Sequence, residues 1–153
     1  MSKREQTKMA FRFRMQKVLE YREQLEEQAK VRLAKDQAQL LDAQNREFAK
    51  KTDLEQIQLK LSDTNLMDNG ERWLTEQYAK GLRQDLTQIA MEIKTFLQIV
   101  DEDKAYLAAR SIDKKMLEKL KEHQKHDYLR AEQIEEQHFN DEISTLRYKV
   151  KAF

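Results

Sequence analysis

The apolar residues of this chain recur at heptad spacing in two long stretches. The first stretch carries Val18, Leu25, Leu33, Leu40, Leu54 and Leu61, with one step of eight between Leu25 and Leu33 and Glu47 at the one step that lacks an apolar residue. The second carries Leu82, Ile89, Phe96 and Leu117, with a companion row four residues on at Leu86, Ile93, Val100 and Leu107. Rows at i and i+4 that repeat every seven residues form one apolar seam along a helix. The pattern therefore predicts two long coiled-coil helices.

A single polar cluster, SDTNLMDNGERW, separates the two stretches. Asn69-Gly70 is a turn signal. Asp68, with Glu71 three residues later, fits a helix N-cap and its capping-box partner, which places Gly70 in the first helical turn. We expect a first helix over about 12–61, a turn over about 63–69 and a second helix over about 71–150.

The two rows match each other when the chain folds back at the turn. For a fold near residue 68, the numbers of facing residues sum to about 136. Leu54 then meets Leu82, and Leu40 meets Phe96, whereas Leu33 faces Asp103 as a polar interruption of the seam. This match favours pairing within one chain over a parallel homodimer. The predicted fold is all-α: an antiparallel coiled-coil hairpin whose second helix is longer and extends past the first.

The part of the second helix beyond about residue 124, here called the overhang, has no facing helix in this register. It still carries apolar residues at helical spacing, namely Tyr128, Ile134, Phe139, Ile143, Leu146 and Val150. An exposed apolar stripe of this kind marks an interaction site. The overhang therefore predicts a partner.

Composition supports this class and excludes others. The chain has no proline, two glycines, 37% charged residues and a net charge of +1, typical of a long helix or coiled coil with no bulk attraction to nucleic acid. It has no cysteine, and no stretch approaches the roughly 20 apolar residues of a membrane span. The N-terminus lacks the apolar core of a secretory signal. We expect a cytoplasmic protein with a flexible extension over 1–10 and one hairpin over 11–153, without direct membrane insertion.

Candidate chemistry is sparse. His123 and His126 lie three residues apart on a helix, as a metal pair would, but two solvated side chains explain them as well. Glu135-x-x-His138 matches one element of a di-iron bundle, which needs two such elements and two further glutamates. No phosphate-binding glycine loop or nucleophile–base set is present. We predict no enzyme, no metal and no cofactor.

Two segments are candidates for partner contact. The first seventeen residues hold six basic side chains against one acid, Glu5; the six are Lys3, Arg4, Lys8, Arg12, Arg14 and Lys17. They fit a solvated end, a tip that docks on an acidic or polar partner, or a DNA-binding basic region, the last disfavoured because Phe11 and Phe13 interrupt it. Trp73, Tyr78 and Leu82 either close the hairpin end as core or form an exposed aromatic patch.

Two further segments have a recognisable pattern. In residues 9–40 an apolar and basic opening precedes Arg and acid-rich heptads; its positions are Phe11, Phe13, Met15, Gln16, Val18, Leu19 and Arg22. This opening resembles the pattern Phe-x-Phe/Leu-x-Leu-Gln-x-Val/Leu-Leu of the FliJ family, small coiled-coil proteins of the bacterial flagellar type III export apparatus, and residues 117–143 resemble the family's second helix.

The resemblance implies a central stalk for a hexameric export ATPase at the cytoplasmic face of the inner membrane, with contacts to the export gate's cytoplasmic domain and to export chaperones. The residues it implies for the ATPase-binding tip are Phe11, Phe13, Gln16, Leu19, Arg22, Tyr128, Glu132 and Glu135. It implies a gate-facing patch of Trp73, Tyr78 and Leu82. The equivalent stalk of a virulence secretion system, and a generic coiled-coil scaffold or chaperone without ATPase contact, remain alternatives.

Overall fold

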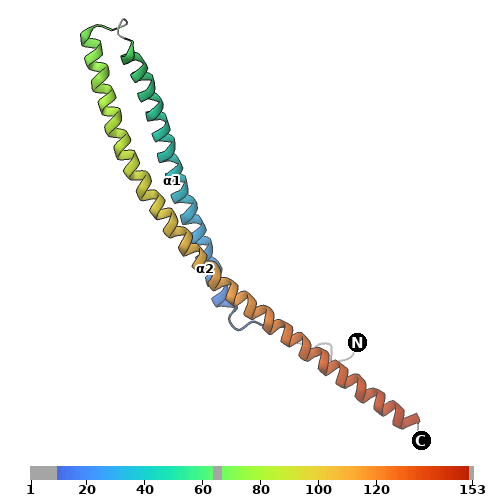
Figure 1. Cartoon of the computed structure of the whole chain (residues 1–153). Helices are drawn as coiled ribbons and strands as arrows, with labels where there is room; N and C mark the ends of the chain where they lie inside the picture. The colour runs from blue at the N-terminus through green and yellow to red at the C-terminus, as the bar shows by residue number, and fades with distance from the viewer. Residues whose placement is uncertain (1–9, 64–66, 152–153) are drawn as a thin grey trace. The chain divides into compact units, whose positions relative to one another are not determined.

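The computed structural model describes residues 10–63 and 67–151, and nearly all of them are helical. Helix α1 spans Gln16–Ser62 and helix α2 spans Asn69–Lys151, 47 and 83 residues long. The two run antiparallel side by side, and α2 continues past the start of α1 (Figure 1). No strand occurs in the described ranges. The predicted all-α hairpin with a longer second helix is confirmed.

Helix α1 begins four residues later than expected. Residues 10–13 are not helical, and the first turn is closed by Gln16 N, which donates to Phe13 O at 3.1 Å. Arg12 and Arg14 would place positive charge at the positive end of the helix dipole, which disfavours helix there. The predicted extension over 1–10 lies outside the described residues apart from Ala10.

Helix α2 begins at the predicted cap. The backbone N–H of Glu71 donates to Asp68 Oδ1 at 2.7 Å, and that of Arg72 donates to Asp68 O at 3.0 Å. Gly70 lies in the first turn, as expected. The predicted turn falls partly outside the described residues, because residues 64–66 are not described.

The described residues divide into two compact units, one formed by residues 27–109 and the other by residues 10–26 with 110–151. In the 27–109 unit, Ile57, Ala79 and Leu82 form a buried cluster, with Leu54 and Leu61 packed against it. This cluster contains the expected Leu54–Leu82 pair. It is the apolar centre of that unit.

Ion pairs across the same unit report its register. Lys50 Nζ lies 3.3 Å from Asp85 Oδ2, and Arg46 Nη2 lies 2.8 Å from Glu92 Oε2. The residue numbers of these pairs sum to 135 and 138. The structure therefore has the antiparallel register that the apolar rows predict.

One layer of this unit is polar and buried. Asp103 is 1% exposed, and its Oδ1 lies 2.9 Å from Arg32 Nε. The Arg32 guanidinium also lies over the Tyr106 ring, 6.0 Å from its centroid. Two effects raise the pKa of Asp103: the larger is its hydrogen bond with the Asp36 carboxyl, and the second is its burial. The positive charge of Arg32 offsets part of this rise. A polar layer of this kind commonly fixes coiled-coil register at a cost in stability.

Replacing Asp103 with leucine is expected to raise the melting temperature by several degrees at pH 7. Because the pKa of Asp103 is raised on folding, the folded state binds its proton more tightly, and wild-type stability falls as the pH rises through the raised pKa. The gain from Asp103→Leu should therefore shrink as the pH is lowered towards 4. Arg32 keeps its solvation in the variant because its side chain is mostly exposed.

The measurement is thermal unfolding by circular dichroism from pH 4 to pH 8, with exposed Asp101→Leu as the matched control. If Asp103→Leu raised the melting temperature by the same amount at every pH, the ionised Asp103 carboxylate would not be the group that destabilises the wild-type chain.

Candidate partner-binding surfaces

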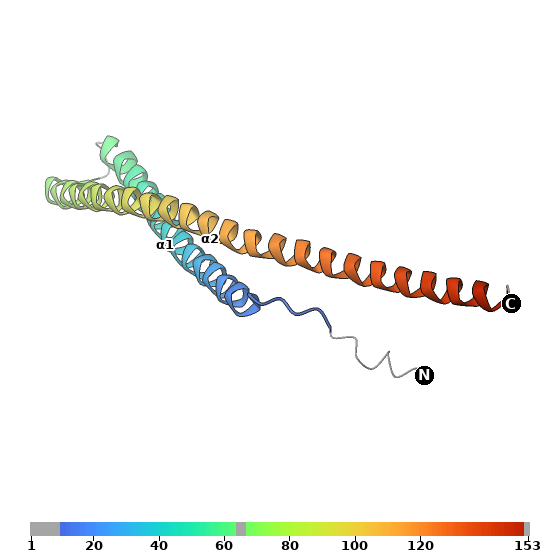
Figure 2. The ribbon, with the colours of Figure 1, turned by 90° about the horizontal axis from the view of Figure 1, so that it is seen from below.

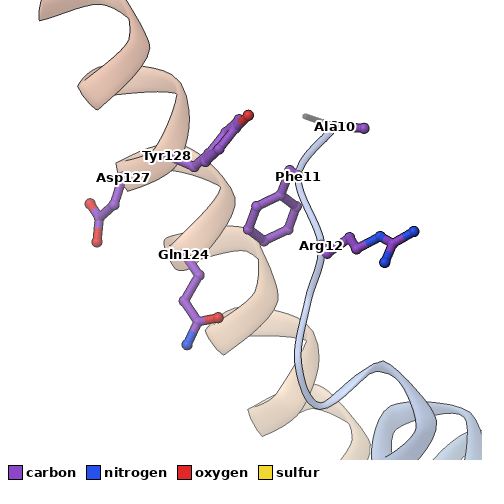
Figure 3. Close-up of a pocket in the computed structure, with 6 residues that line it drawn as sticks. All are labelled: Ala10, Phe11, Arg12, Gln124, Asp127 and Tyr128. Atoms are coloured by element: carbon purple, nitrogen blue, oxygen red, sulfur yellow. The ribbon is translucent and has the colours of Figure 1, made fainter. Parts of the chain in front are cut away.

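The segment before α1 is held against α2 by an aromatic contact. The rings of Phe11 and Tyr128 lie with centroids 5.6 Å apart and planes tilted by 51°. Figure 3 shows Phe11 turned towards α2 beside Tyr128, while the Arg12 side chain points away from that helix. Ala10, Gln124 and Asp127 complete a shallow pocket around this contact. Phe11 and Tyr128, both predicted for the tip, are therefore partly used inside the chain.

Polar contacts continue this attachment along the start of α1. Lys121 Nζ donates to Gln16 Oε1 at 2.8 Å, and Arg22 Nη1 donates to Asp113 Oδ2 at 2.9 Å. One turn further on, Lys114 Nζ lies 3.0 Å from the buried Glu26 carboxylate, which raises the pKa of Lys114. Gln16 and Arg22 thus hold the two helices together in this unit.

The predicted seam shifts by one residue at the start of α1. Leu19 is 3% exposed whereas Val18 is 40% exposed, and Phe13 is buried as well. The structure places Leu19 and Phe13, both predicted for the tip, inside the helix pair, and it places Val18, predicted for the seam, on the surface. The other predicted seam residues are buried or half-buried: Leu25, Leu33, Leu40, Leu54, Leu61, Leu82, Ile89, Phe96 and Leu117.

A different set of side chains faces solvent at this end of α1. We call it the N-terminal surface; it consists of Arg12, Arg14, Met15, Lys17, Val18 and Tyr21, all of them exposed. It combines three cations with three apolar side chains, a composition suited to a partner surface that carries both carboxylates and apolar groups. Met15 was named from the sequence only as a match to the family pattern and Tyr21 was not named, although their helical spacing from Val18 is visible there.

A second exposed group lies in the first turns of α2. Trp73, Leu74 and Tyr78, here called the α2-start patch, are all more than half exposed, Trp73 by 60%. Leu82 is only 2% exposed and belongs to the core cluster. The alternative in which Trp73 and Tyr78 are core residues is wrong, because both side chains are exposed. The assignment of Leu82 to a surface patch is also wrong, because Leu82 is buried. Leu74, one turn before Tyr78, was missed.

The overhang presents a third exposed group. Phe139, Leu146 and Val150 are between 44% and 77% exposed, and Ile143 is half-buried. Leu129, Ile134 and Tyr148 are exposed as well, Glu132 is half-buried and Glu135 is exposed. Figure 2 shows α2 continuing as one helix through this region. The overhang thus carries the apolar stripe that the sequence predicted.

The candidate metal residues lie on the surface. His123 Nε2 lies 3.6 Å from Asp127 Oδ2, and His126 Nδ1 lies 3.9 Å from Asp127 Oδ1. Within residues 10–63 and 67–151 no three His, Cys, Asp or Glu side chains are arranged to hold a metal ion. No helix among these residues is long and apolar enough to cross a membrane.

Two antiparallel helices with exposed basic, aromatic and apolar side chains define a coiled-coil hairpin protein. A family model of the flagellar FliJ protein matches residues 11–152, nearly the whole chain, and the chain therefore belongs to the FliJ family. It is a component of the flagellar type III export apparatus, in a family whose members are non-catalytic. Neither the search of curated proteins nor that of solved structures found a match.

Proposed function

We propose that this protein is the stalk and activator of the hexameric flagellar export ATPase. The observation that carries the proposal is that one unit holds two exposed surfaces, the N-terminal surface and the overhang. A helical stalk that enters a ring needs side chains that remain available after its own helices have paired. Arg12, Arg14, Tyr21, Leu146 and Val150 are available in this way.

In this proposal the contact is assigned to different residues from those that the resemblance implied. Phe13, Leu19 and Arg22 form the support beneath the surface, because they are buried or ion-paired within the chain. The contacting cations in the described part are Arg12, Arg14 and Lys17. These cations bind carboxylates or backbone carbonyls on the inner surface of the ring, and Val18 and Tyr21 pack against apolar groups beside them.

A two-helix stalk activates a ring by binding its states unequally. Contacts that are better in the closed hexamer than in free subunits shift the equilibrium towards the hexamer. Contacts with only some subunits make those subunits different from the others. In this way a chain without catalytic groups raises the ATP turnover of its partner.

The proposal extends to two further partners at the cytoplasmic base of the flagellum. The α2-start patch offers Trp73 and Tyr78, residue types that dominate interface hot spots, to the cytoplasmic domain of the export gate. The exposed helical surfaces are the binding sites we assign to export chaperones. The same stalk chemistry would serve a virulence secretion system, but the family match is to the flagellar protein.

The deciding experiment adds the full chain to its cognate export ATPase at stoichiometric ratio. Mass photometry should show more hexamer, and a phosphate-release assay should show faster ATP turnover. An unchanged hexamer population and unchanged turnover would leave the generic scaffold, the alternative without ATPase contact, as the better account.

A further inference from the structure

Four apolar residues of the overhang keep heptad spacing, because Phe139 and Leu146 lie seven residues apart and so do Ile143 and Val150. Tyr128, Phe139 and Val150 are spaced by eleven, and Ile143 and Leu146 fall between the last two. Eleven residues make close to three helical turns, so all five lie on one face of α2. Phe139, Ile143, Leu146 and Val150 thus form a continuous stripe along about three turns, and Leu146 and Val150 are mostly exposed.

The charges beside this stripe are divided by sign along the helix. Acidic residues precede its centre and basic residues follow it: Glu135, Glu136 and Glu142, then Arg147 and Lys149. Glu142 and Lys149, seven residues apart, lie along the same edge of the stripe. A second helix with the same division, running in the opposite direction, would place its basic half beside this acidic half.

We propose that the overhang is a self-association surface whose occupant is the overhang of a second copy, packed antiparallel. In this register Ile143 faces Leu146 of the second copy and Phe139 faces Val150 of the second copy. Residues on one edge of an antiparallel pair face the same edge of the other helix, so Glu142 meets Lys149 of the second copy. Two-fold symmetry repeats each of these contacts.

Charge argues against the parallel arrangement of the same two helices. Glu132 and Glu135 lie on the stripe face before Phe139, and parallel copies would bring them against the same residues of the second copy. Like charges packed at such a position destabilise the pair. The parallel arrangement would also gather the basic residues of both copies at one end. The antiparallel register avoids both arrangements.

The size of the surface sets the strength of the contact. Four apolar side chains per copy bury less than the roughly 800 Å² per partner that stable complexes use. The dimer is therefore reversible and forms at high protein concentration. Because it covers Leu146 and Val150, it competes with the ATPase contact of the proposed function and forms when the ATPase is absent. Sedimentation velocity should show the 18.4 kDa chain moving towards twice its mass as the concentration approaches about 100 μM, within the micromolar-to-millimolar range of weak complexes.

The register can be tested by disulfide trapping because the chain has no cysteine of its own. A tagged Ile143→Cys chain is mixed with an untagged Leu146→Cys chain and oxidised without any ATPase present. A mixed disulfide should form in preference to either same-position product, since a disulfide needs Cα atoms within about 7 Å. Dominance of same-position products would establish a parallel pair and overturn the proposal.

A charge exchange provides the second arm. Lys149→Glu should lower the dimer fraction severalfold, because it places a second carboxylate beside Glu142 of the other copy. The double variant Glu142→Lys with Lys149→Glu should restore the dimer fraction. Far-UV circular dichroism confirms equal helicity of the variants. A wild-type chain that keeps the mass of one copy at about 100 μM would assign the stripe to a partner of different sequence and overturn the second-copy assignment.

Discussion

Replacing Leu82 with alanine is expected to lower the free energy of unfolding by about 3 kcal/mol, the usual cost of a buried leucine-to-alanine change. Leu82 lies at the centre of the cluster that joins α1 to α2 in the 27–109 unit, packed with Ile57 and Ala79. The hairpin has only a narrow apolar seam, so the cavity has few neighbouring side chains that can move in to fill it. The folding equilibrium should change more than a hundredfold.

Urea unfolding followed by circular dichroism at 222 nm measures this loss on the full chain. Leu74→Ala is the matched control, because Leu74 has the same side chain two turns earlier on α2 but is mostly exposed. The control should change stability by no more than about 0.5 kcal/mol. Equal losses in the two variants would mean that the seam is not where the structure places it.

The fold was predictable because several independent patterns agree. The heptad rows, the Asp68 cap and the facing residue numbers all indicate the same antiparallel hairpin. The ion pairs Lys50–Asp85 and Arg46–Glu92 then show the expected register in the structure. Sustained periodicity over many turns averages out local ambiguity. This is why the core around Leu54 and Leu82 could be anticipated.

The residues of the candidate surfaces were harder to predict, for identifiable reasons. Val18 and Leu19 are adjacent apolar residues at the end of the heptad row, so a one-residue change of phase exchanges their environments. The segment around Phe11 is not helical, and periodicity therefore cannot indicate its contact with Tyr128. Trp73 precedes Leu82 by nine residues, which is half a turn out of phase on a helix, so their spacing indicates opposite faces and the prediction that grouped them overlooked this.

The buried polar contacts show a further limit of reasoning from apolar periodicity. Asp103 occupies a seam position, and the facing rows predict Leu33 opposite it, whereas Arg32 reaches across to pair with it. A long side chain next to a seam position can place its charge in the seam while much of the chain stays solvated. The same reach lets Arg22 pair with Asp113, which removes Arg22 from the set of cations free to bind a partner.

Reversing two charges of the N-terminal surface, with Arg12→Glu and Arg14→Glu together, is expected to weaken ATPase binding about tenfold. Two interface charges at roughly 0.7 kcal/mol each give this factor. Both side chains are exposed, and Arg12 points away from α2, so the hairpin itself should keep its stability. Arg22 is left unchanged because its reversal would break the ion pair with Asp113.

The measurement is the concentration of chain that gives half-maximal stimulation of ATP turnover. Lys94→Glu with Lys104→Glu is the control, since it changes net charge equally at exposed positions of the 27–109 unit. The difference between the two double variants should shrink as salt is raised, because screening weakens exposed charge pairs. Identical stimulation curves for the two would remove the N-terminal surface from the ATPase contact, even if the wild-type chain activates the ring. The overhang would then have to carry that contact through Leu146 and Val150.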